Sequence, residues 1–204
     1  MKKDFSLLAS QGQIGRAMKA LEANGMKTYF AATGAEAKQK VFDLIPEGAE
    51  VMNMTSVTLD TIGVAQEILE SGKYDPVRAK LNDTVTPTAI KRQLGGAADW
   101  TIGSVHALTE DGKLMIASNT GSQLGAYSYG SPHLIWVVGA QKIVKDLEEG
   151  MRRLHEYVLP LESERANEAY NITNGSFISK LLIFNREITP DRVSVIIVNE
   201  KLGF

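Results

Sequence analysis

Residues 26–72, MKTYFAATGAEAKQKVFDLIPEGAEVMNMTSVTLDTIGVAQEILESG, decide the fold class. Short apolar runs at about 27–31 and 50–54 are each followed by apolar residues at helical spacing, at about 34–45 and 56–71. A short buried strand that alternates with an amphipathic helix is typical of a parallel sheet with crossover helices. The stretch therefore predicts an α/β fold with an open, mostly parallel sheet.

The rest of the chain extends this pattern. An apolar run at 134–139 precedes a helical pattern at about 142–158, so we expect the strands at 27–31, 50–54 and 134–139 to be central. The runs DWTIGSVHAL and KLMIAS, joined by TEDG, predict a hairpin. We expect one domain over residues 1–204, with two strands in 171–204 forming a small C-terminal extension or edge addition.

Composition excludes several classes of function. The chain has 204 residues, with 22 Lys and Arg against 24 Asp and Glu and a net charge of −2, which favours neither nucleic acid nor a membrane surface as partner. Without cysteine it holds no disulfide, thiolate zinc site or iron–sulfur cluster of its own. Because no apolar run approaches the roughly 18 residues of a membrane span, we expect a cytoplasmic protein.

A first candidate site follows the strand at 50–54. The segment VMNMTSVTLDTIG leads Asn53, Thr55 and Ser56 directly into a helix. Backbone N–H groups at the start of a helix attract anions, so these residues are candidates for substrate binding. The alternative is that Thr55 and Ser56 only cap their own helix.

A second candidate site is the loop SNTGSQLGAYSYG, which interrupts two apolar runs. Glycine allows a ligand to approach the backbone, and hydroxyl and amide side chains supply hydrogen bonds. The glycine spacing is neither that of a P-loop nor that of a dinucleotide fingerprint, and a plain crossing loop is the alternative. We expect the loop to face Thr55 and Ser56 across one cleft and to bind a small anionic metabolite through Ser118, Asn119, Thr120, Gly121, Ser122 and Gln123.

His106 and Glu110, in GSVHALTEDG, are the candidate catalytic residues. In an extended segment, residues four apart point to the same side, so both could bracket a substrate, with the imidazole titrating near neutral pH. The alternatives are a half-buried structural histidine and a glutamate that belongs to a hairpin turn. The three histidines lack metal-ligand spacing, so we expect no metal site.

The chain resembles the LUD domain family, the lactate-utilisation proteins, from about Gln13 to Phe204. The segments that carry the resemblance are LIPEGAEVMNMTSVTLDTIG, GSVHALTEDGKLMIASNTGSQLGAYSYGSPHLIWVVGAQKIVKDLEEG, YVLPLESERANEAY and VNEKLGF. The resemblance implies the fold of glucosamine-phosphate deaminases, ribose-phosphate isomerases and CoA transferases, a Rossmann-like sheet with helices on both faces. Proteins with this fold bind sugar phosphates, folates or acyl-CoA near the carboxyl ends of the strands.

The resemblance also implies a functional context. Lactate-utilisation systems pair the LUD protein with iron–sulfur partner proteins, so we expect a link to lactate or organic-acid utilisation and a phosphosugar, CoA ester or carboxylate ligand, with no cofactor identified. The alternatives are a non-catalytic accessory subunit of an iron–sulfur lactate-oxidising complex and a CoA transferase-like enzyme with Glu110 as nucleophile. A homo-oligomer stays open. Many family members carry Ala-Glu-Thr-Gly-Thr where this chain has SVHALTEDG, which indicates a distinct branch.

Overall fold

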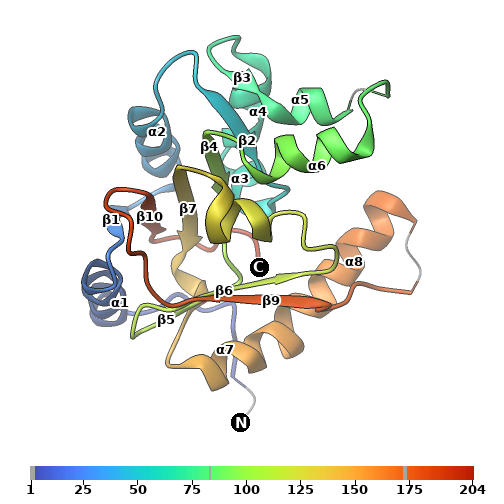
Figure 1. The fold of residues 1–204 in the computed structure, drawn as a ribbon. Coiled ribbons are helices and arrows are strands. Elements are labelled where there is room, and N and C mark those ends of the chain that lie inside the picture. The colour runs from blue at the N-terminus through green and yellow to red at the C-terminus, as the bar shows by residue number, and fades with distance from the viewer. Residues whose placement is uncertain (1–2, 83, 172–173) are drawn as a thin grey trace.

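The larger of two sheets has six strands, all parallel (Figure 1). The computed structural model describes residues 3–82, 84–171 and 174–204. The strand order is β1–β10–β7–β4–β2–β3, which confirms the predicted open parallel α/β sheet. The strands are β1 (Lys27–Ala31), β2 (Glu50–Asn53), β3 (Asp75–Pro76), β4 (Trp100–Gly103), β7 (His133–Gly139) and β10 (Val193–Val198).

Helices cover both faces of this sheet because side chains along each strand alternate between two cores. In β7, Ile135 and Val137 point into one core, while Leu134, Trp136 and Val138 point into the other. The first core is covered by α2 (Gly34–Leu44), α3 (Val57–Thr61) and α4 (Val64–Glu70). The second is covered by α1 (Gln11–Ala23), α5 (Val77–Asn82) and α6 (Thr88–Gly96).

A smaller sheet packs beside α1 on the second core. Its order is β8–β5–β6–β9, formed by β5 (Ala107–Thr109), β6 (Leu114–Ser118), β8 (Ile143–Val144) and β9 (Lys180–Phe184). A third core covers its outer face, where α7 (Leu147–Arg153) and the π-helical turn Leu154–Val158 pack, and α8 (Leu159–Tyr170) continues from that turn (Figure 1). A further π-helical turn, η1 (Ala126–Gly130), precedes β7.

Several predicted strands lie elsewhere than expected. The hairpin is present as β5 and β6, but the run 99–108 is divided between the two sheets, because the chain leaves the large sheet after Gly103. The expected edge addition at 171–204 is wrong for β10, which lies between β1 and β7 with all six residues buried. β1 forms an edge of the sheet and is not central.

Two predicted helices are shorter than expected. The helix expected at 56–71 is interrupted at Gly63, which has a left-handed φ of 70° and separates α3 from α4. The helix expected at 142–158 begins only at Leu147, because Ile143 and Val144 pair with β5. Within the described ranges, the structure contains no helix with the length and apolar character needed to cross a membrane.

Candidate functional site

A cavity of about 1030 Å³ lies at the carboxyl ends of β2 and β4. After β2 the chain continues to β3, at one edge of the sheet, whereas after β4 the next strand of this sheet is β7, on the opposite side. The direction in which strands are added therefore reverses between β2 and β4. Open α/β sheets bind ligands in the crevice at such a switch point. The remaining walls come from α6, the loop after β6, and α8. The topology thus opens this cavity where the fold class places ligands.

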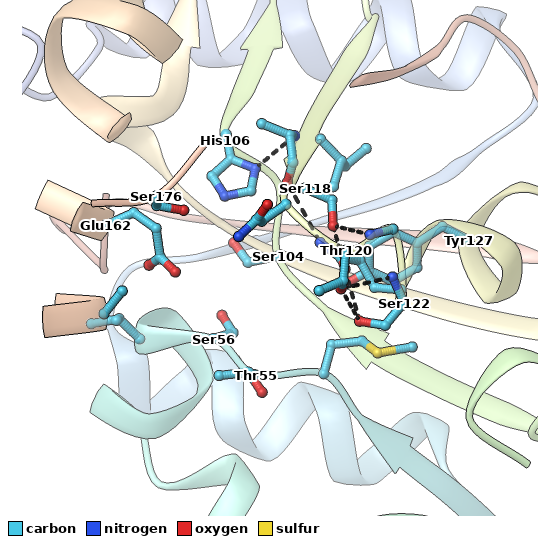
Figure 2. A pocket seen from close by; sticks show the side chains of 18 of the residues that line it. Thr55, Ser56, Ser104, His106, Ser118, Thr120, Ser122, Tyr127, Glu162 and Ser176 are labelled. Atoms are coloured by element: carbon cyan, nitrogen blue, oxygen red, sulfur yellow. Dashed lines mark hydrogen bonds between the residues drawn. The ribbon is translucent and has the colours of Figure 1, made fainter. Parts of the chain in front are cut away.

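The two polar segments singled out in the sequence line this cavity from opposite sides (Figure 2). Thr55 is exposed on one wall, and the Ser118–Gln123 loop lies across from it. Ser56 accepts a hydrogen bond from the Leu59 N–H at 3.4 Å, so it also caps α3, as the alternative interpretation held. Asn53 does not line the cavity: its side chain is buried, and its carbonyl accepts two hydrogen bonds from Arg78.

The loop at 118–123 is held in shape by its own hydroxyl groups. The Ser118 hydroxyl accepts from the Gly121 N–H at 2.8 Å and donates to Gln123 Oε1 at 3.0 Å. Gly121 has a φ of 83°, a left-handed conformation that L side chains rarely adopt. The Ser179 hydroxyl adds an external bond, donated to Asn119 Oδ1 at 3.2 Å. These hydrogen bonds, within the loop and to Ser179, define the shape of the loop.

His106 lines the cavity as a neutral hydrogen-bond donor. Its Nδ1 accepts from the Ala117 N–H at 3.1 Å, so the ring hydrogen is on Nε2. Burial, followed by the positive charges of Lys142 and Arg153, lowers the pKa of His106 to about 3. The expected titration near neutral pH is therefore wrong for this environment.

Glu110 lies outside the cavity, against α1. Its carboxylate accepts from Arg16 Nε at 2.7 Å and from Gln13 Nε2 at 2.9 Å, and the Arg16 hydrogen bond is the largest cause that lowers its pKa. Alternation could put both side chains on one side of the strand but not in one site, because four residues of extended chain span about 13 Å. A shared catalytic site for His106 and Glu110 is a wrong prediction, and Glu110 cannot act as a nucleophile in this cavity.

Lys142 is one of the cavity residues that the sequence prediction missed. Its side chain is 2% exposed, and its Nζ lies 2.9 Å from Thr58 Oγ1 and 3.0 Å from Ser104 Oγ. Burial, and then the charge of Arg153, holds the pKa of Lys142 well below its usual value. In the sequence, the sign of this site is one lysine inside the apolar run LIWVVGAQKIV. The sequence analysis placed that lysine at the start of the helix expected at 142–158.

The cavity lining is rich in cations although the chain carries a net charge of −2. Among the described residues, the lining carboxylates are Asp60 and Glu162; Glu162 accepts two hydrogen bonds from Arg165 at 2.7 Å, while burial raises the pKa of Asp60. Among the described residues there is no cluster of three His, Asp or Glu side chains that could hold a metal ion. The lining cations are Arg78, Lys91, Arg92 and Arg165, and the buried amine of Lys142 is a fifth basic group.

Comparison with known proteins identifies the family. The family model of the LUD domain matches residues 14–198. The chain belongs to the LUD domain family. This LUD domain is similar to the crystal structure of a DUF162 family protein from Deinococcus radiodurans, with a TM-score of 0.60 and 12% identity over 95% of this chain and 100% of that chain. DUF162 is the same family, and the match shows a shared fold.

A second solved structure shares only part of the chain. Ribose 5-phosphate isomerase from Plasmodium falciparum gives a TM-score of 0.33 and 17% identity over 55% of this chain and 52% of that chain, which is too low to show a common fold. Among curated proteins, none is similar enough in sequence to count as a match.

Proposed function

We propose that this LUD domain binds a small anionic metabolite, such as a phosphosugar, a CoA ester or a carboxylate, in the cavity at the ends of β2 and β4. The observation that carries the proposal is the charge of the lining: among the described residues, three arginines and Lys91 lie against two carboxylates, in a chain with an excess of acidic residues. A cleft lined by one sign of charge concentrates ligands of the opposite sign.

Two features of the walls support this function. Glu162 pairs with Arg165, so this carboxylate and this guanidinium neutralise each other, and the other described charges of the lining are Arg78, Lys91 and Arg92 against Asp60. The His106 Nε2–H and the Thr55 hydroxyl add uncharged donors to the same lining. The carboxylate class includes 2-hydroxy acids such as lactate, the metabolite that links the family resemblance to organic-acid utilisation.

A thermal-shift screen tests the proposal. Phosphosugars, CoA esters, lactate and other 2-hydroxy acids are added to the whole chain, together with uncharged polyols as controls. A ligand that binds only the folded state at about 100 times its Kd stabilises it by about 2.7 kcal/mol, which raises Tm. We expect at least one anionic class to raise Tm while the uncharged polyols do not.

A matched pair of variants locates the binding site. Arg92→Gln removes a cation from the cavity lining, whereas Arg186→Gln removes an exposed cation outside it. We expect Arg92→Gln to reduce the ligand-induced rise in Tm and Arg186→Gln to leave it unchanged. Equal effects of the two variants would reject the cavity as the binding site.

A further inference from the structure

The hydrogen bonds around Lys142 show which group is the donor and which is the acceptor in each of them. The Thr58 hydroxyl donates to the Leu202 carbonyl at 3.1 Å, and the Ser104 hydroxyl donates to the Val137 carbonyl at 2.7 Å. Both hydroxyl hydrogens are used, so each hydroxyl oxygen must accept from the Lys142 amine. A neutral amine has two N–H bonds, and this arrangement occupies both of them. Its lone pair is left over.

The surroundings favour the neutral form of that amine. Lys142 is buried, and no carboxylate lies within salt-bridge distance of it in the part of the chain that the structure describes. A buried ammonium without a counterion is unfavourable, and the nearby Arg153 guanidinium makes it more so. Lys142, Thr58 and Ser104 all line the cavity, so the amine lies at its wall. Desolvated lysines of this kind react with carbonyl groups.

We propose that Lys142 forms an imine with an anionic aldehyde or ketone bound in the cavity. This inference rests on the proposed function, because the cationic lining must first hold the anionic group of the ligand. The amine lone pair attacks the carbonyl carbon, and a proton moves from nitrogen to the carbonyl oxygen to give a carbinolamine. The carbinolamine then loses its hydroxyl group and the second amine hydrogen as one water molecule, and the C=N bond forms. One amine and one carbonyl give one imine and one water, without an oxidant or reductant.

His106 supplies the matching donor for the ligand oxygen. Its hydrogen is on Nε2, because Nδ1 accepts from Ala117, and the ring lines the same cavity as Lys142. A neutral imidazole N–H can polarise a carbonyl without giving up its proton. The site thus combines a neutral amine nucleophile, a neutral donor and cations that hold an anion.

Reductive trapping tests the imine directly. The native protein is incubated with sodium cyanoborohydride and either pyruvate, a ketone with a carboxylate, or dihydroxyacetone phosphate, a ketone with a phosphate. Acetone, a ketone without charge, is the control. We expect intact-mass spectra to show one reduced adduct with at least one anionic ketone, faster than with acetone, and peptide mapping to place it on Lys142.

Two variants make the assignment specific. Lys142→Met removes the amine but keeps an unbranched buried side chain, and it should lose the adduct while keeping a cooperative thermal transition. Lys145→Met removes an exposed lysine outside the cavity lining and should keep the adduct on Lys142. Equal trapping in Lys142→Met and the unchanged protein would overturn the proposal.

Anions without a carbonyl separate this inference from the proposed function. Lactate and glycerol 3-phosphate carry the same charged groups as the two ketones but cannot form an imine. If they raise Tm and neither ketone is trapped on Lys142, the imine is overturned while anion binding stands. If there is neither a rise in Tm nor trapping, both proposals are overturned.

Discussion

At His106, one backbone N–H decides which ring nitrogen faces the cavity. The Ala117 N–H occupies Nδ1, and burial lowers the pKa of the ring to about 3, far from the ordinary value of 6.5. Between these two values the unfolded chain takes up a proton that the folded protein does not. Stability is therefore lost as the pH falls below 6.5, and the loss continues down to the folded pKa.

We expect His106→Asn to flatten this pH dependence. Asparagine keeps an acceptor for the Ala117 N–H but does not titrate, so the free energy of unfolding should fall less steeply between about pH 6 and pH 4, by up to about 1.4 kcal/mol per pH unit. Urea denaturation at several pH values measures the difference. His155→Asn, at an exposed histidine, is the control and should keep the slope of the unchanged protein.

Arg153 is a buried charge on α7. It is fully buried, and none of its three guanidinium nitrogens has a hydrogen-bond partner among the described residues, although it lies 5.1 Å from the Tyr157 ring centre. We expect Arg153→Met to raise the free energy of unfolding by about 1–2 kcal/mol, because an apolar side chain of similar length needs no counterion. Denaturant melts measure this change.

The exposed neighbour Arg152 provides the control. Arg152→Met should change the free energy of unfolding by less than about 0.5 kcal/mol. A lower free energy of unfolding in Arg153→Met would reject the argument.

Single residues also mark the limit of sequence reasoning. Thr55 and the Ser118–Gln123 loop could be assigned to one cavity because each follows a recognisable strand. Lys142 could not, because its significance depends on the hydroxyls of Thr58 and Ser104, which lie 84 and 38 positions away in the chain. Glu110 failed for the same reason, since its partner Arg16 is 94 positions away.

At the scale of one element, the shape of the loop after β6 should affect both stability and anion binding. Ser118 is buried, and its hydroxyl joins the Gly121 N–H to Gln123. We expect Ser118→Ala to lower the free energy of unfolding by about 1–2 kcal/mol, because it removes the acceptor of that N–H. It should also reduce the rise in Tm that an anion produces. Ser122→Ala, in the exposed part of the same loop, should change stability much less, and equal losses would show that Ser118 does not organise the loop.

Helices and strands could be predicted where the spacing of apolar residues and the length of the run indicated the same kind of element. The alternation of β1, α2 and β2 was readable because each apolar run ends at a distinct turn or cap, such as Thr33 at α2. The run 99–108 looked continuous, yet its first half pairs with β7 and its second half with β6. Pairing partners decide that division, and a local pattern contains no information about them.

At the scale of the whole molecule, the cavity depends on segments far apart in the chain. The C-terminal strand β10 lies inside the large sheet, and Arg192 at its start binds the turn η1 that precedes β7. Its guanidinium donates to the carbonyls of Ala126 and Tyr127 at 3.1 and 3.0 Å, and to that of Ser131 at 2.8 Å. Tyr127 lines the cavity, so β10 supports one wall without touching the ligand space.

The ion pair of Arg192 with Glu187 gives the global test of this arrangement. The two side chains are each 7% exposed and lie 2.6 Å apart. Removing one partner of a buried pair leaves an uncompensated charge, so Arg192→Met should lower the free energy of unfolding by about 3–5 kcal/mol. Arg192→Met combined with Glu187→Gln should be less destabilised than the sum of the two single changes, because the double variant buries no lone carboxylate. Urea melts of the four proteins give this coupling energy. Strict additivity would mean that the pair does not act as a unit, and that the bonds to the η1 carbonyls alone fix the position of Arg192.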